Sequence, residues 1–327
     1  MLPSFRVLSV SDTGWLLYMV EAEVTDRENS KVSSGIQRGA VKRSRPKVLA
    51  MIWALLLGAG CFGLRAASSA PDPPGRIVSL APNLTELLFE LGVGSQIVGV
   101  TTYCVYPPEI RRIEKIGGFI NPSLEKILSL EPTLVFSERW TSSKTVPTLR
   151  RLGLKVVEVP SPFSLAEIYQ LMRITGEAIG RAERAEQLIQ AMMDQVQQIR
   201  EKAKSFPRRP TLYVEIDPPS WTIGSKSFVN EAVSLCGAQN IFADVSRPAL
   251  QVSKEVIVLK DPEIILSFDA SASEISRRPG WHRIRAVRNG SVIDDLDRDL
   301  LTHGNHRLAE GMRQLQERVR KLIESRP

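Results

Sequence analysis

The sequence predicts an α/β fold in which two parallel-sheet lobes are joined by a long, rigid α-helix. One segment occurs twice, 130 residues apart, as Ser123–Val135 and Ser253–Ile265, and Glu125 aligns with Glu255 in the two copies. Each copy reads as a short helix, an acidic-Pro turn and a buried strand, so the repetition predicts two similar lobes. The alternative is chance similarity, because single units of this kind are common in α/β proteins.

Residues 75–160 and 210–325 show the alternation that the two lobes need. Apolar runs such as Ile97–Val100 alternate with helical segments in the first range, and in the second the strand Thr211–Glu215 is followed by the helix Phe228–Leu235. Strands that alternate with helices favour a parallel sheet. We therefore assign the first range to an N-terminal lobe and the second to a C-terminal lobe; 327 residues suffice for both.

Residues 164–206 are predicted to connect the lobes through helices. The stretch from Ala182 to Ala203 is helical in pattern and contains no strand or turn signal. At 1.5 Å per residue it spans roughly 30–35 Å, about the width of a small domain. We interpret it as a rigid connector, with an ordinary surface helix as the alternative. The last helix is expected over Gly304–Ile323, with one apolar face.

Two short patterns indicate where helices begin. Asn83 with Glu86, and Ser164 with Glu167, have the residue types and spacing of the capping box. In this motif the first side chain accepts from a free backbone amide three residues later, and the acid accepts from the first residue's amide. We expect both pairs to close the starts of their helices.

The N-terminus has the features of a secretory signal in residues 41–70. A basic stretch precedes the apolar run Val48–Leu64, and small residues follow. We expect export to the periplasm or another extracytoplasmic location, with a retained anchor as the alternative. If the chain is processed as a lipoprotein, Cys61 carries a lipid anchor. Because signals start at the N-terminus, we interpret residues 1–40 as an over-extended gene prediction, with translation starting at Val41.

Composition and motifs argue against several classes of function. The net charge is +7, but the first 70 residues contain nine Lys or Arg and five Asp or Glu, so the remainder gives no argument for a nucleic-acid partner. The glycine-rich phosphate loop, the nucleophile elbow and the H-E-x-x-H motif are missing, so no enzyme is expected. No C-x-x-C pair occurs, and we expect neither a metal centre nor a resident cofactor. Cys104 and Cys236 are expected to be free or buried thiols rather than a disulfide.

Five further segments carry a family resemblance: Arg76–Glu86, Gly94–Val100, Thr102–Glu109, Asp217–Pro219 and Gln251–Glu255. Together with the paired copies they resemble the cobalamin-binding subgroup of substrate-binding proteins for ATP-driven (ABC) importers. The resemblance covers about residues 75–325 and implies two Rossmann-like lobes with a ligand cleft between them. It implies an exported protein that captures a corrinoid (cobalamin, vitamin B12) and delivers it to an importer. A ferric siderophore or haem receptor of the same family is the alternative, followed by an enzyme on a related two-lobed scaffold.

The resemblance implies that six side chains contact the ligand. They are Tyr103, Phe119, Trp140, Trp221, Asp299 and His303. Large flat rings suit a macrocycle through dispersion and buried area. Core packing is the alternative for each aromatic ring, and ordinary hydrogen bonding is the alternative for the histidine. Ala249 and His303 stand where a relative has Trp and Arg, which leaves the ligand's identity open.

The resemblance also implies that Glu125 and Glu255 dock the protein on Arg residues of the permease dimer. Carboxylate–guanidinium pairs are directional, and one acid on each of two similar lobes suits a partner with two-fold symmetry. The alternative is that both acids are simply solvated helix residues. We expect the protein to be a monomer.

Overall fold

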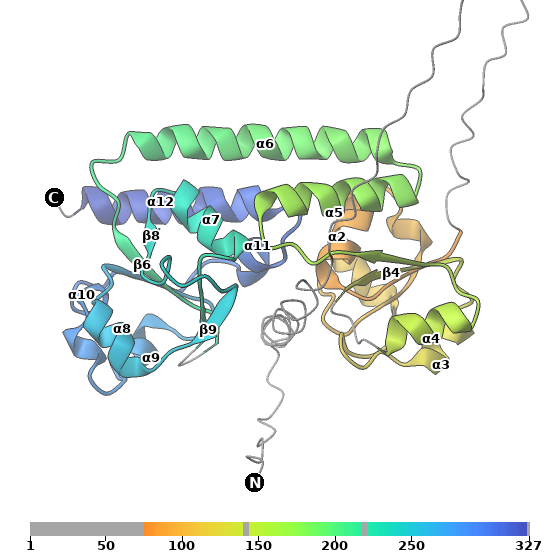
Figure 1. Cartoon of the computed structure of the whole chain (residues 1–327), viewed down its shortest axis with the longest axis horizontal. Coiled ribbons are helices and arrows are strands. Elements are labelled where there is room, and N and C mark those ends of the chain that lie inside the picture. Colours follow the sequence, from red (N-terminus) through yellow and green to blue (C-terminus); the bar gives the residue numbers. More distant parts are fainter. Residues whose placement is uncertain (1–74, 140–143, 218–220, 326–327) are drawn as a thin grey trace, which may run out of the picture.

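The computed structural model describes residues 75–139, 144–217 and 221–325 and arranges them as two α/β lobes (Figure 1). The predicted fold class is confirmed, because each lobe is built on a parallel sheet. The predicted signal segment, Cys61 and Trp140 lie outside the described residues. Within the described part of the chain, every helix is too short or too polar to cross a membrane.

The N-terminal lobe is built on a five-stranded parallel sheet of order β3-β2-β1-β4-β5. Its elements are β1 Ile77–Ser79, α2 Pro82–Glu90, β2 Ile97–Val100, β3 Glu114–Lys115, α3 Leu124–Ser129, β4 Leu134–Glu138, α4 Thr145–Arg151 and β5 Val156–Val159, with short 3-10 helices at Gly94–Gln96 and Pro108–Arg112. The central strand β1 is fully buried and pairs Ile77 with Ile97 on one side and Leu134 on the other. Apolar strands buried on both faces are what a parallel sheet requires.

The C-terminal lobe has a four-stranded parallel sheet of order β11-β10-β6-β8 and an antiparallel pair, β7 with β9. Its strands are β6 Thr211–Glu215, β7 Trp221–Ile223, β8 Gln239–Asn240, β9 Ala249–Gln251, β10 Ile264–Ser267 and β11 Val292–Ile293. Its helices are α7 Phe228–Leu235, α8 Lys254–Lys260, α9 Ala272–Ser276, α10 Arg285–Arg288, α11 Arg298–Thr302 and α12 Leu308–Glu324, with a 3-10 helix at Trp281–Arg283. The β7–β9 pair lies on the side of this lobe that faces the N-terminal lobe (Figure 1).

Three long helices form a layer along one side of both lobes: α5 Leu165–Ala178, α6 Ala182–Lys204 and α12 (Figure 1). The predicted connector is α6, whose 23 residues span roughly 34 Å. It buries one stripe, which includes Ile189 and Ile199, against the other two helices. Gln316 of α12 also donates to the Ile199 carbonyl at 2.6 Å. The connector is therefore supported along its length by packed helices.

The repeated segment adopts the same backbone path in both lobes. The helices α3 and α8 are each followed by an acidic residue with positive φ, 45° at Glu131 and 43° at Asp261. They are the two non-glycine residues with positive φ in the described part of the chain. This conformation is uncommon for such residues, and its recurrence confirms that the two segments are structural equivalents. Each turn leads into a buried strand, β4 or β10.

Two local predictions are wrong. Asn83 and Glu86 do not form a capping box, because α2 begins at Pro82 and its N-cap is Ala81, without a capping side chain. The last helix begins at Leu308 rather than Gly304, since Gly304 adopts a φ of 55° that interrupts the helical path. By contrast, the capping box at the start of α5 and the free, buried state of both described cysteines are confirmed.

Candidate functional site

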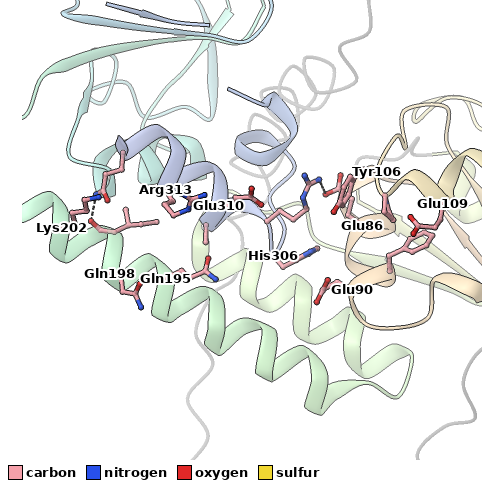
Figure 2. Close-up of a pocket in the computed structure, with 16 residues that line it drawn as sticks. Glu86, Glu90, Tyr106, Glu109, Gln195, Gln198, Lys202, His306, Glu310 and Arg313 are labelled. Carbon is pink, nitrogen blue, oxygen red and sulfur yellow. Dashed lines mark hydrogen bonds and ion pairs between the residues drawn. The ribbon is translucent and has the colours of Figure 1, made fainter. Parts of the chain in front are cut away.

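A cavity of about 840 Å³ lies where the N-terminal lobe meets α6 and α12 (Figure 2). Glu86, Tyr106, Gln195, Lys202 and His306 are among the residues that line it. The lining mixes acids, bases and amides, which is a poor match for a large apolar ring. None of the described ligand-contact candidates lines this cavity, so it is not the site that the sequence predicts.

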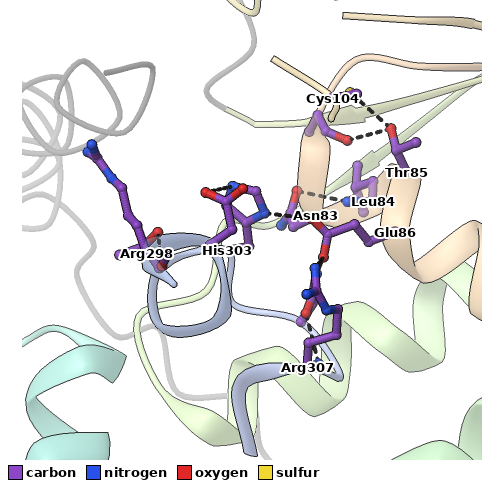
Figure 3. Close-up of polar contacts among 12 residues, drawn as sticks. Asn83, Leu84, Thr85, Glu86, Cys104, Arg298, His303 and Arg307 are labelled. Atoms are coloured by element: carbon purple, nitrogen blue, oxygen red, sulfur yellow. Dashed lines mark hydrogen bonds and ion pairs between the residues drawn. The ribbon is translucent and has the colours of Figure 1, made fainter. Parts of the chain in front are cut away.

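Glu86 lies between this cavity and a polar network that joins the two lobes (Figure 3). Its carboxylate is 3% exposed. One oxygen lies 2.8 Å from His303 Nδ1, and the other accepts from Asn305 Nδ2 at 2.8 Å and Arg307 Nη1 at 3.1 Å. The guanidinium of Arg307 also lies over the Tyr106 ring, 3.8 Å from its centroid. A carboxylate of the N-terminal lobe thus contacts three side chains of the turn between α11 and α12.

His303 is held at both ring nitrogens. Nδ1 contacts Glu86, and Nε2 lies 3.2 Å from Asp299 Oδ1. Burial lowers the pKa of His303, but the hydrogen bonds to Asp299 and Glu86 outweigh burial and raise the pKa to about 9. The imidazole is therefore protonated at neutral pH and donates on both sides. In this arrangement it has no lone pair with which to bind an iron or cobalt ion.

A second carboxylate lies beside this network at the carboxyl end of β4. Glu138 is 3% exposed and accepts from Asn83 Nδ2 and from Ser161 Oγ, the latter at 3.1 Å. Burial raises the pKa of Glu138 to about 7, although both hydrogen bonds oppose the shift. The carboxyl group is therefore poised to change its protonation near neutral pH.

The C-terminal lobe places charged groups at the carboxyl ends of neighbouring strands. Asp217 follows β6, and Asp269 follows β10. Arg298 Nη1 donates to both Asp269 oxygens at 2.9 and 3.0 Å, whereas its Nη2 is buried and lacks a hydrogen-bond partner among the described residues. Burial raises the pKa of Asp217, and the Asp269 charge adds to this effect. Open α/β sheets bind ligands beyond the carboxyl ends of their strands, so Arg298 offers a free donor where a ligand is expected.

The predicted aromatic contacts differ in how much surface they offer. Tyr103, which follows β2, and Trp221, at the start of β7, are partly buried and pack against the main apolar core. Phe119 is only 7% exposed and belongs to that core, so its ring offers a ligand little surface. Trp140 follows β4 and lies outside the described residues. The polar candidates Asp299 and His303 contact each other.

The predicted docking acids lie on exposed helix surfaces. Glu125 is in the first turn of α3, and Glu255 occupies the same position in α8. Both side chains are exposed, and neither forms an ion pair within the described ranges. Both helices lie on the side of their lobes away from α6 (Figure 1). The two acids therefore present exposed carboxylates on one side of the molecule, and the Glu255 carboxylate accepts from its own backbone amide and from the Ser253 hydroxyl.

Sequence analysis missed Glu86, Asn305 and Arg307 as partners across the lobe boundary. The available signal was the run of polar residues around Gly304, namely His303, Asn305, His306 and Arg307. Such a run indicates a turn but does not show which residues its side chains contact.

The described residues contain no group of three His, Cys, Asp or Glu side chains that could hold a metal ion.

Sequence comparison places the chain among transport receptors. The profile of the family described as periplasmic binding protein matches residues 77–298. The chain is 35% identical over 254 residues to the uncharacterized ABC transporter substrate-binding lipoprotein YvrC of Bacillus subtilis, which covers 75% of this chain and 80% of the relative. It is 29% identical over 242 residues to the vitamin B12-binding protein of Pectobacterium atrosepticum, over 71% of this chain and 85% of the relative.

Solved structures give the same fold with two kinds of ligand. The apo periplasmic heme-binding protein RhuT of Roseiflexus matches with a TM-score of 0.71 and 26% identity, over 76% of this chain and 98% of that protein. The periplasmic vitamin B12 binding protein BtuF of Vibrio cholerae matches with a TM-score of 0.67 and 26% identity, over 77% of this chain and 99% of that protein. The fold alone therefore does not separate a corrinoid from haem.

Proposed function

Because the chain belongs to the periplasmic binding protein family, we propose that it is an exported receptor that captures a corrinoid and delivers it to an ATP-driven importer. The similarity to vitamin B12-binding proteins supports the ligand class. The similarity to a substrate-binding lipoprotein supports an extracytoplasmic location with a lipid at Cys61. The protein itself carries out no chemistry in this proposal.

The ligand lies between the lobes, on the side away from α6 and α12. Tyr103, Trp140 and Trp221 contact the faces of the macrocycle, and Phe119, which is nearly buried, contributes a small contact. All four residues lie in or beside segments that follow strands of the parallel sheets, or on the β7–β9 pair that faces the other lobe. Burial of flat rings against a large ring system supplies most of the affinity.

The observation that carries the proposal is the hydrogen-bonded chain Asp299–His303–Glu86. It fixes Asp299, the expected polar contact, by a protonated imidazole whose other nitrogen is held in the opposite lobe. The remaining Asp299 oxygen is available to accept from an amide side chain of a corrinoid. Arg298 precedes Asp299 in the sequence, and its Nη2 has no partner among the described residues. This nitrogen is a donor for the carbonyl of a corrinoid amide.

The main alternative is a haem receptor, supported by the similarity to RhuT. The unpaired Nη2 of Arg298 would suit a haem propionate as well as an amide. However, haem receptors that ligate iron through a side chain need a free lone pair, and His303 offers none here. The same consideration disfavours ligation of cobalt by His303, so a corrinoid bound through its ring and amides fits better.

The test is to incubate the purified mature protein separately with cyanocobalamin, haem and a ferric siderophore, and to desalt each sample. Retention of the cyanocobalamin spectrum at one equivalent supports the proposal, and retention of haem alone overturns it. Tryptophan fluorescence adds a second readout, because Trp221 is partly exposed while Trp281 is fully buried. A Trp221→Phe variant should show less quenching by cyanocobalamin than the matched variant Trp281→Phe.

A further inference from the structure

Exposed apolar side chains gather on the two helices of the sequence repeat. The described residues expose seven large hydrophobic side chains, and three of them, Leu128, Val256 and Leu259, lie on α3 and α8. These helices contain only six and seven residues. Single apolar side chains scattered over a surface are ordinary, but here they recur on two matched helices, one in each lobe, which indicates a partner that touches both lobes.

On α8 the apolar side chains share a face with the predicted docking acid. Glu255 and Leu259 are four residues apart, and Val256 and Leu259 are three apart, so the three lie together on the helix surface. Leu259 is 84% exposed and Val256 39% exposed. Ile257 is fully buried and holds the opposite face of α8 against the lobe. The outer face therefore combines one exposed carboxylate with two apolar side chains.

The helix α3 repeats this arrangement with less apolar surface. Glu125 and Leu128 are three residues apart, and Leu128 is 38% exposed. Ile127 is fully buried and anchors the helix, as Ile257 does in α8. Both helices thus present an acid followed, one turn later, by an apolar side chain.

We propose that Leu128 on α3, together with Val256 and Leu259 on α8, forms the apolar part of the surface on which the permease dimer docks. The partner is a membrane protein with two related sockets, each of which offers a cation beside an apolar side chain. This inference rests on the proposed function and extends it. Charge favours such a partner over a second copy of this chain. Lys126 is paired with Glu114, and Lys260 donates to the Ile241 carbonyl, so a second copy would offer the acids on α3 and α8 only Lys254 from these two helices.

The two lobes contribute unequally, since α8 exposes more apolar surface than α3. Charged pairs at an interface mainly set orientation and the rate of association, whereas buried apolar anchors slow dissociation. Leu259→Ser should therefore weaken binding to the permease roughly tenfold, mostly through faster dissociation. Leu128→Ser should have a smaller effect. Glu255→Ala should also weaken binding, and it should reduce the dependence of binding on salt.

The experiment measures binding of the full mature protein to its importer in lipid nanodiscs by biolayer interferometry. The variants are Leu259→Ser, Leu128→Ser and Glu255→Ala, with Met193→Ser as the matched control. Met193 is 42% exposed and lies on α6, on the opposite side of the molecule from α3 and α8. The inference predicts unchanged cyanocobalamin binding in all four variants and normal permease binding in the control.

Three other outcomes would contradict the apolar contact, the docking proposal or the choice of partner. If Leu259→Ser binds the permease like Met193→Ser while Glu255→Ala is weakened, the apolar contact is wrong and the docking role of the acids stands. If none of the variants is weakened, the docking proposal fails as well. If the unmodified protein sediments as a dimer and Leu259→Ser makes it monomeric, the surface belongs to a second copy and the inference is overturned.

Discussion

The carboxylate of Glu86 and the imidazole of His303 form an ion pair of 2.8 Å that joins the N-terminal lobe to the turn before α12. The two residues are 217 positions apart in the sequence. The second Glu86 oxygen is bound by Asn305 and Arg307 from the same turn. One buried side chain therefore fixes the turn that follows α11, the helix that carries Asp299, the expected ligand contact.

Replacing Glu86 with Gln should destabilise the protein strongly. Glutamine keeps the shape of the side chain but removes the charge, which leaves His303 and Arg307 without their shared anion. Breaking a buried ion pair by removal of one partner costs roughly 3–5 kcal/mol. Urea unfolding at pH 7 measures the effect. The control is Glu90→Gln in the same helix, whose exposed pair with Arg184 should contribute less than about 1 kcal/mol; equal losses would show that the Glu86 network adds nothing.

The stability that His303 contributes should disappear at alkaline pH. Its pKa is raised from 6.5 to about 9, so the folded state holds the proton more tightly than the unfolded state. The contribution is complete below pH 6.5 and is lost as the pH rises through 9. The groups that face the imidazole are Glu86 and Asp299, with the Arg307 cation bound to the same carboxylate. Wild-type protein should lose about 3 kcal/mol between pH 6 and 10 through this group, and His303→Gln should lack that slope in unfolding experiments.

Glu138 should make stability fall as the pH rises across the neutral range. Here the pKa is raised by burial of the carboxyl group rather than by hydrogen bonds. Burial raises its pKa from 4.5 to about 7, so the folded state prefers the protonated carboxyl group. Its contribution is full below pH 4.5 and is lost as the pH rises through 7. The shift corresponds to about 3 kcal/mol. In Glu138→Gln this decline should be absent, because an amide does not titrate in this range. The variant should still fold, since the amide can accept from Asn83 and donate to Ser161. Parallel stability curves for the two proteins between pH 4.5 and 8 would contradict the prediction.

Much of the fold was predictable because it depends on short-range patterns. The apolar strands, the 23-residue helix α6 and the paired acidic-Pro turns follow from hydrophobic period, propensity and repetition along the chain. The Glu131 and Asp261 turns illustrate this point, since the residues that fix them are neighbours in the sequence. The same holds for the capping box that begins α5.

The site was less predictable because its contacts join distant segments. The sequence suggested that Glu86 caps its own helix, yet Pro82, whose fixed φ suits the first helical turn, moves the helix start and frees Glu86 for the other lobe. Nothing local indicates that its partner is His303. Likewise, the resemblance that marks Asp299 as a ligand contact gives no sign that its oxygen is held by an imidazolium.

The docking role of Glu125 and Glu255 predicts transport effects without ligand effects. Both acids are exposed on helices away from α6, and neither contacts the charged network around Glu86. Glu255→Ala should weaken permease binding roughly tenfold and leave cobalamin affinity unchanged. The double variant with Glu125→Ala should be weaker than either single variant. Uptake assays and cobalamin titrations of the same proteins provide the measurement; normal transport by the double variant would remove these residues from the docking surface.

Ligand binding should change the angle between the lobes only slightly. The helix α6 is continuous across both lobes and is packed against α12, which donates to it through Gln316. The Glu86–His303 pair ties the lobes at a second point, so a large hinge motion would have to break both. A compact chain of about 250 residues has a radius of gyration of roughly 18 Å, and it should fall by less than about 1 Å when cobalamin is added, as measured by small-angle X-ray scattering. A decrease of several ångströms would show that the helical layer bends. In Glu86→Ala only the second tie is removed, so a larger decrease in this variant than in the wild type would assign part of the rigidity to the ion pair rather than to α6.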